Sequence, residues 1–164
     1  MNRITNGFGM SVIVVAGVIG GLVFAVFEMM MAAIMMGPQA FFMPLRMIGA
    51  IVLGEAALDP SYSLLMAGMA GLIVHMVLSI AFAAVLAVIV KALTSVGSAL
   101  AAGTVFGIAL WIVNFYVLAP MMGWIWFPER TNVAVQFMAH AFFFGLVTAW
   151  YLTSQRTAVV QAGA

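Results

Sequence analysis

Residues 64–90 have the sequence LLMAGMAGLIVHMVLSIAFAAVLAVIV, which contains no charged side chain and ends directly before Lys91. A helix needs about 20 consecutive apolar residues to cross the hydrocarbon core of a bilayer. Positions four residues apart share one face of a helix, and here they are small or polar throughout: Ala67, Gly71, His75, Ser79, Ala83 and Ala87. In lipid, helices associate through close contacts between such residues. This run therefore predicts a membrane-spanning helix with one packed face that carries a histidine.

Three other stretches have a similar composition. Residues 10–36, 96–118 and 133–152 are long apolar runs in which Glu28 is the one charged residue. Charged residues make up 5% of the chain and hydrophobic residues 67%, whereas a soluble domain carries about 25% charged residues. We therefore expect an all-α integral membrane protein, a single domain with four transmembrane helices in a lipid bilayer.

The connection between the first two spans is long enough to hold a further helix. Residues 44–58 begin with Pro44, which suits a first helical turn, and Asp59–Pro60 follow as a stop signal. This segment is too short to span the bilayer, so we expect an interfacial or re-entrant helix. If it did cross, the C-terminus would move to the other side of the membrane.

The first run could also belong to a cleaved signal peptide, because Arg3 precedes it. However, the run is longer than a usual signal-peptide core, and no clear small-x-small cleavage site follows it. We therefore expect it to be retained as a span.

The two halves of the chain share a pattern. GLVF at 21–24 and GTVF at 103–106 each open a stretch that leads to two prolines, an arginine and then a helix with one histidine. The matched pairs are Pro38 with Pro120, Pro44 with Pro128, Arg46 with Arg130, and His75 with His140. Two helices per unit return the chain to its starting side, so this pattern predicts two parallel two-helix repeats.

The basic residues predict the orientation. With four spans, Arg3, Lys91 and Arg156 fall on one side of the membrane, and Arg46 and Arg130 fall on the other. Cytoplasmic loops carry the excess of Lys and Arg. We therefore expect both termini to face the cytoplasm.

Each predicted span carries a polar residue at a similar depth. Glu28 lies eight residues before Met36, or about 12 Å from the end of its run at a rise of about 1.5 Å per residue. The corresponding positions in the other runs also lie between this end and the midplane. We therefore expect one buried polar cluster, formed by Glu28, His75, Asn114, Gln136 and His140.

Small residues in the same runs predict where helices pack against one another. They recur at spacings of three or four residues, as expected for one face of a helix. The candidate packing residues are Gly17, Gly21, Gly71, Ser79, Gly103 and Gly107.

The role of the polar cluster stays open at this point. An ionisable residue inside a span indicates a functional site, but interhelical hydrogen bonds can also be purely structural. The cluster could support passage of protons or small ions. His75 and His140 could instead be axial ligands of a haem, and together with Glu28 they could hold a divalent metal. Thioethers such as Met31 and Met35 favour Cu(I). Our main expectation is that no cofactor is bound.

Several function classes are disfavoured by composition. The net charge is +1 and there is no run of Lys or Arg, so nucleic acid is not an expected partner. The chain has no cysteine, which excludes disulfides and iron–sulfur clusters. It also contains no P-loop, Gly-x-Ser-x-Gly or His-Glu-x-x-His motif. We therefore expect a non-enzymatic protein.

The stretch from His75 to Trp150 resembles the YagU-like family of bacterial inner-membrane proteins. The resemblance rests on the sequence HMVLSIAFA at 75–83, Gly103 and Gly107, the exit near Pro120, and residues 136–140. It covers roughly half the chain and does not extend to Glu28. It implies a location in the bacterial inner membrane and supplies no mechanism.

Taken together, these features predict a multi-pass membrane protein whose polar cluster is structural or supports passage of protons or small ions. The alternatives are a homo-oligomer or an accessory subunit docked to a membrane complex, and a haem- or metal-binding module.

Overall fold

The computed structural model describes the backbone of residues 8–162 and the side chains of residues 8–156; Arg3 lies outside the described residues. The described chain is helical, with four segments long and apolar enough to cross a membrane. They are α1 (Met10–Met36), α3 (Leu64–Lys91), α4 (Val96–Val113) continued by η3 (Asn114–Leu118) and α5 (Ala119–Met121), and α7 (Val133–Met138) continued by η4 (Ala139–Leu146) and α8 (Val147–Ala162). The predicted all-α membrane fold is confirmed.

The helix ends lie close to the predicted ones. The first predicted span, 10–36, coincides with α1, and the second ends one residue early, because α3 includes Lys91. The third predicted span stopped at 118, whereas the helix continues through Pro120 to Met121. The fourth stopped at 152, whereas α8 continues to Ala162. The helical residues beyond these two predicted ends are polar or include a proline, and hydropathy alone does not assign such residues to a helix.

Three of the four spans begin at a side-chain cap. Ser63 accepts a hydrogen bond from the backbone N–H of Met66 at 3.3 Å, and Ser95 accepts one from Ser98 at 3.0 Å. Asn132 caps the start of α7 through its Oδ1. Such caps satisfy N–H groups that have no partner inside the helix.

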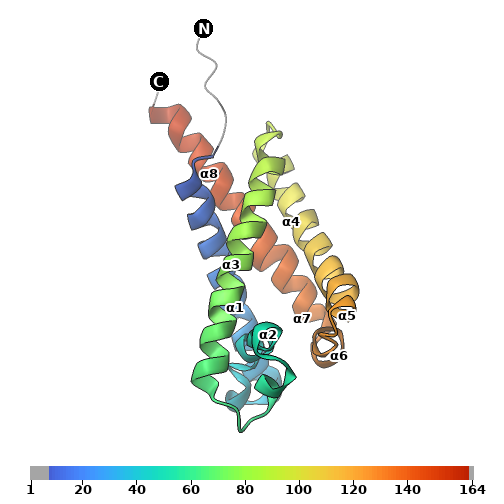
Figure 1. Ribbon diagram of the computed structural model, residues 1–164. Coiled ribbons are helices and arrows are strands. Elements are labelled where there is room, and N and C mark those ends of the chain that lie inside the picture. The colour runs from blue at the N-terminus through green and yellow to red at the C-terminus, as the bar shows by residue number, and fades with distance from the viewer. Residues whose placement is uncertain (1–7, 163–164) are drawn as a thin grey trace.

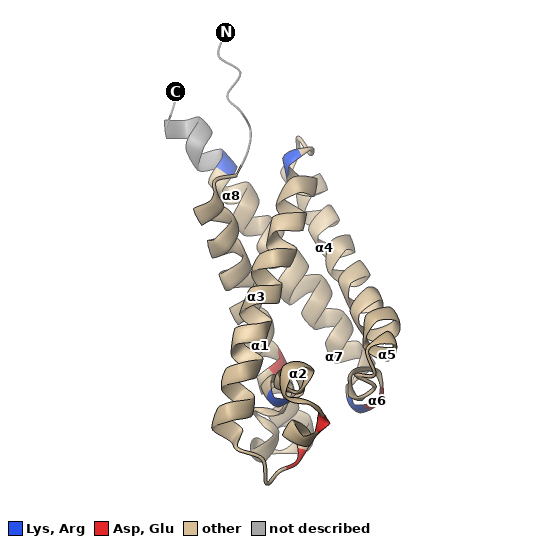
Figure 2. Ribbon diagram, viewed as in Figure 1, with Lys and Arg blue, Asp and Glu red and all other residues tan. Residues whose placement is uncertain are grey.

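The four spans form two antiparallel pairs (Figure 1). In the first pair α1 packs against α3, and in the second α4 packs against the η4 and α8 part of the last span. We call the end where α1 begins, α8 ends and residues 92–95 join α3 to α4 the terminal end. The opposite end, which carries the connections 37–63 and 122–132, is the loop end. Charged residues gather near these two ends, and the long helices between them are almost uncharged (Figure 2).

The long connection differs from the prediction in one respect. The expected helix at 44–58 is two pieces, α2 (Met43–Leu53) and the short 3-10 helix η2 (Glu55–Leu58). Gly54 separates them with a φ of 81°, a left-handed conformation that ends a helix and favours glycine. Another short 3-10 helix, η1 (Pro38–Ala40), follows α1.

The helix α2 lies across the bundle and does not span it. It is seen nearly end-on in Figure 1, where the four spans run from the top to the bottom of the picture. Its Leu45 carbonyl contacts Gly71 of α3, and Gly49 contacts the Ala67 carbonyl. Gly71 is seven residues into α3, about 10 Å from its start at about 1.5 Å per residue. The described structure thus has a helix at this place that does not span the bundle, as the expected interfacial or re-entrant helix would not.

The predicted packing residues all lie at contacts between helices. A Cβ added at Gly17 would come within 2.5 Å of the Ile80 Cα, and one at Gly21 within 2.7 Å of the Ser79 Oγ. These contacts join α1 to α3. In the second pair, a Cβ at Gly103 would meet the Ala149 Cβ at 2.5 Å. The remaining residues of this set are Gly71, which faces α2, and Gly107, which faces the His140 carbonyl.

The internal repeat stays a prediction. Both pairs are antiparallel, and α1 and α4 start from the same end of the bundle. However, α2 lies in the first half, whereas the π-helical segments η3 and η4 both lie in the second. In place of α2, the second half has only α6 (Trp126–Arg130).

Candidate functional site

A cavity of about 440 Å³ lies between the two helix pairs in the half of the bundle nearer the loop end. Its wall includes parts of α1, α2, α3, α4, η3, α7 and η4. All five residues of the predicted polar cluster line it: Glu28, His75, Asn114, Gln136 and His140. The structure thus brings to one cavity residues that are up to 112 positions apart in the sequence.

Glu28 joins the first span to the last. The side-chain amide of Gln136 donates a hydrogen bond of 3.0 Å to Glu28 Oε2. Glu28 is 8% exposed and Gln136 4%. The second carboxyl oxygen, Oε1, is buried and has no hydrogen-bond partner among the described residues. One of the two oxygens therefore ties α1 to α7, and the other is free to bind something else.

The two histidines are held by backbone carbonyls. His75 Nε2 lies 2.8 Å from the Gly21 carbonyl oxygen, and His140 Nδ1 lies 2.8 Å from the Gln136 carbonyl oxygen. Because a carbonyl only accepts, each of these ring nitrogens carries a hydrogen. The other nitrogen of each neutral ring, Nδ1 of His75 and Nε2 of His140, is then an acceptor. Neither makes a hydrogen bond within the described part of the chain.

Phe24 brings the two imidazoles near each other. Its ring centroid is 5.1 Å from that of His75 and 4.8 Å from that of His140. The two imidazole centroids are therefore no further apart than the sum of these distances. His140 lies in η4, and π-helical turns of this kind occur often at functional sites.

Apart from Asn114, the rest of the wall is mainly aromatic and aliphatic. Asn114, the first residue of η3, is partly buried, and its side chain has no hydrogen-bond partner among the described residues. α2 contributes Ile48 and Ile51. The aromatic lining residues are Phe24, Phe82, Phe115, Trp124, Phe127 and Phe144.

The cavity opens toward the side of the bundle. Among the lining residues, only Leu78 of α3, at 40%, and Leu118 of η3, at 43%, are strongly exposed. These two leucines lie on spans from different pairs. The opening therefore faces the surface that lipid covers, between α3 and η3.

Toward the terminal end the bundle is apolar and tightly packed. Its core consists of buried aliphatic residues, none of them more than 3% exposed: Ala16, Ala83, Leu86, Ala87, Val90, Ala99, Ala149 and Leu152. The buried polar side chains in this half, Thr148 and Thr153, are not ionisable. Within residues 8–156, no chain of ionisable groups continues from the cavity to the terminal end.

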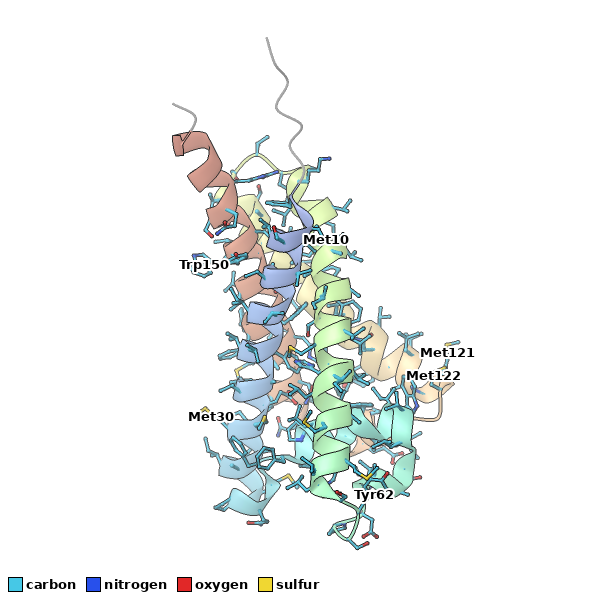
Figure 3. The ribbon with its side chains drawn as sticks, turned by 60° about the vertical axis from the view of Figure 1, so that its left-hand side comes forward. Met10, Met30, Tyr62, Met121, Met122 and Trp150 are labelled. Carbon is cyan, nitrogen blue, oxygen red and sulfur yellow. The ribbon has the colours of Figure 1, made fainter. Side chains whose placement is uncertain are left out.

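The residues considered for a metal are not arranged as a metal site. In the described part of the chain, no group of three or more His, Cys, Asp or Glu side chains is close enough to hold a metal ion. The methionines considered for copper lie elsewhere, and none of residues 29–36 lines the cavity. Met30 points outward (Figure 3) and is 52% exposed, as is Met35.

The sequence analysis missed the structural role of Arg46, which it used only for the orientation and for the internal repeat. Arg46 is 8% exposed, and its Nη1 donates to the carbonyl oxygens of Ala57, Asp59 and Tyr62 at 2.9, 2.8 and 3.2 Å. These bonds hold the connection after α2 against the helix. A single arginine in an otherwise apolar helix was the available signal, because such a charge must find partners when buried.

A second missed contact also fixes α2. The indole N–H of Trp126 donates to the Met47 carbonyl oxygen at 3.2 Å, and Trp126 is 3% exposed. Because Met47 lines the cavity, Trp126 positions part of its wall. By contrast, the ion pair of Arg130 with Glu55, at 3.4 Å, is exposed and contributes little to stability.

No protein-family model matches the chain, and no curated protein or solved structure is significantly similar to it. The resemblance to the YagU-like family therefore stays a prediction. The site must be interpreted from its own geometry.

Proposed function

We propose that this multi-pass membrane protein binds a small, mainly apolar molecule with one polar group in its cavity and does not change it chemically. The observation that carries this proposal is the convergence of five polar side chains from both helix pairs on one cavity of about 440 Å³. Ligand cavities typically have volumes of about 300–1,000 Å³, with mostly apolar walls and a few polar groups. We further propose a bacterial inner-membrane location with both termini in the cytoplasm.

A purely structural role explains only part of the cluster. The bonds from Gln136 to Glu28 and from His75 to Gly21 join helices, and each such bond contributes about 1 kcal/mol. A cluster that served only to join helices would pair its buried polar atoms, because an unpaired one costs about 1–3 kcal/mol. Yet Glu28 Oε1 is buried and has no hydrogen-bond partner in the part of the chain that the structure describes. A guest with a polar group would satisfy it.

Passage of ions or protons is less well supported than binding. Transfer across the bilayer needs groups or water on both sides of the site. The terminal half offers packed aliphatic side chains such as Leu86, Val90 and Leu152, each 0% exposed. The cavity therefore has the form of a binding site that is closed at one end.

The absence of cysteine allows a direct test, because every introduced thiol is unique. Ser79→Cys places a thiol on the cavity wall, and Ala83→Cys places one a turn further along α3 in the packed core. The thiolate is the reactive form, so N-ethylmaleimide labels a thiol that both water and reagent reach. In nanodiscs, we expect Ser79→Cys to be labelled at least about tenfold faster than Ala83→Cys.

Binding is then measured as protection from this labelling. We expect 4-phenylbutanol, an amphiphile small enough for the cavity, to slow the labelling of Ser79→Cys in a saturable way. Equal labelling rates for the two variants would mean that the cavity is closed. Unchanged labelling with this alcohol and with charged analogues of the same size would refute binding.

A further inference from the structure

We infer that the guest is a lipophilic cation: a protonated amine on an aromatic or aliphatic body. This inference rests on the proposed binding function and specifies the chemistry of its ligand. It follows from the kinds of polar atom in the cavity, the aromatic side chains around them and the position of the opening.

The unpaired polar atoms of the cavity are mainly hydrogen-bond acceptors. Glu28 Oε1 has no hydrogen-bond partner within residues 8–156. The free nitrogens of His75 and His140 accept in the neutral rings, because carbonyls hold the opposite N–H groups. The Asn114 amide can turn its oxygen toward the same space. An ammonium group, which has only donors, complements this set.

The charged residues of the cavity wall also favour a cationic guest. Among the described residues, Glu28 is the one acidic residue that lines the cavity, and no Lys or Arg lines it. Arg46 lies in α2 beside lining residues, but it directs its guanidinium to loop carbonyls. An anionic guest would meet a carboxyl group and no cation to pair with. A cationic guest would pair with the ionised form of Glu28 inside the membrane, where an unpaired charge is costly.

The aromatic side chains add a second attraction for a cation. The face of an aromatic ring carries negative electrostatic potential, so a cation within about 6 Å of a ring centroid is attracted to it. Phe24 packs against both histidines, and Phe115 packs against His140 with their centroids 5.5 Å apart. A cation that reaches Glu28 and the two imidazoles therefore also lies among aromatic rings.

The opening fits a ligand that first dissolves in the bilayer. It lies between Leu78 and Leu118, both on the lipid-facing surface. Toward the terminal end the core is closed. An amphiphilic amine that partitions into lipid can thus reach the cavity sideways without crossing the packed half.

The test compares three molecules of one shape and different charge: 4-phenylbutylamine, 4-phenylbutanol and 4-phenylbutyrate. Their affinities are measured in nanodiscs from protection of Ser79→Cys against N-ethylmaleimide, with each concentration corrected for partition into lipid. We expect the amine to bind about tenfold more tightly than the alcohol, since hydrogen bonds to charged groups are the stronger ones, and the butyrate to bind most weakly.

A substitution that removes the charge of Glu28 tests whether the cavity causes the preference for the amine. Glu28→Gln keeps an oxygen that can accept from Gln136, and we expect it to abolish the advantage of the amine over the alcohol. Glu129→Gln, a matched change at an exposed position outside the cavity, should retain the full advantage. Correct folding of each variant is checked by its labelling rate without ligand and by monodisperse elution.

The outcomes separate the two proposals. If the alcohol or the butyrate binds as tightly as the amine, the cation inference is wrong and the binding function stands. If the amine keeps its advantage in Glu28→Gln, the inference is also wrong. If none of the three molecules protects the thiol, the proposed function itself fails.

Discussion

Alanine at Gly71 should destabilise the protein, whereas alanine at Gly68 should not. The two glycines are one turn apart in α3. A Cβ at Gly71 would overlap the Leu45 carbonyl of α2, with the Leu45 carbonyl carbon at 2.7 Å and the Gly49 nitrogen at 3.1 Å. At Gly68 no atom of the described residues lies within 4 Å of such a Cβ. Both substitutions raise helix propensity by the same amount. The difference between their unfolding free energies therefore measures the contact of Gly71 with α2.

The size of the effect follows from the atoms involved. All three atoms near the added methyl belong to the backbone, so no side chain can rotate away, and α2 must move. Overpacking of this kind costs about 1–3 kcal/mol. The gain in helix propensity is about 1 kcal/mol and applies to both variants. We therefore expect Gly68→Ala to be neutral or slightly stabilising, and Gly71→Ala to be about 1–3 kcal/mol less stable than Gly68→Ala.

The measurement is reversible unfolding of purified protein in mixed micelles of mild detergent and dodecyl sulfate, followed by circular dichroism. Ser79→Cys labelling in the Gly71→Ala background should also change, because α2 forms part of the cavity wall through Ile48 and Ile51. Equal unfolding free energies for the two alanine variants would show that α2 does not rest on Gly71. The position of α2 against α3 would then be refuted.

Three further predictions concern the loop end and the topology. Arg46→Met should destabilise the fold by about 3 kcal/mol or more, because three loop carbonyls lose a charged donor. Limited proteolysis of this variant should then cut within residues 54–63. An unchanged cleavage pattern would contradict the role of Arg46 in holding this loop. The Ser61 hydroxyl holds the pKa of Asp59 below its usual range, so Ser61→Ala should raise that pKa toward its ordinary value in an NMR titration. Because the pKa of Asp59 is lowered in the folded chain, its contact with Ser61 stabilises the fold at pH values above the ordinary pKa of Asp59. This stabilisation is lost as the pH falls through the lowered pKa. A reporter fused after Ala164 should be active only if it is one that works in the cytoplasm, and a working periplasmic reporter would overturn the orientation.

The spans could be predicted because hydropathy and length act locally. Each run of apolar residues is long enough to cross the bilayer by itself, so no knowledge of its neighbours was needed. The polar cluster followed from one further step. Once the runs were placed as antiparallel spans, depth alone put Glu28, His75 and His140 at one predicted level of the membrane, and all three line one cavity.

The missed features depend on contacts between distant segments. The break at Gly54 needs a left-handed φ, and a glycine within an apolar run does not reveal which conformation it takes. The role of Arg46 depends on where the carbonyls of residues 57–62 turn, which is irregular backbone without a periodic signal. The π-helical segment η4 packs its His140 carbonyl against Gly107 of another span. No pattern within η4 records that neighbour.

The connection between α3 and α4 has a mechanical consequence for the cavity. The two helices meet at residues 92–95 and diverge from there (Figure 1), and the residues of α3 that line the cavity lie in the middle of that helix. Leu78 lies 13 residues before Lys91 at the end of α3, which gives a lever arm of about 20 Å, so a rotation of about 5° around this pivot would move Leu78 by roughly 2 Å. Arg156 of α8 fastens the pivot by donating to the carbonyl oxygens of Lys91 and Leu93, both at 2.7 Å. The width of an opening between Leu78 and Leu118 is thus set partly by one side chain at the opposite face of the membrane.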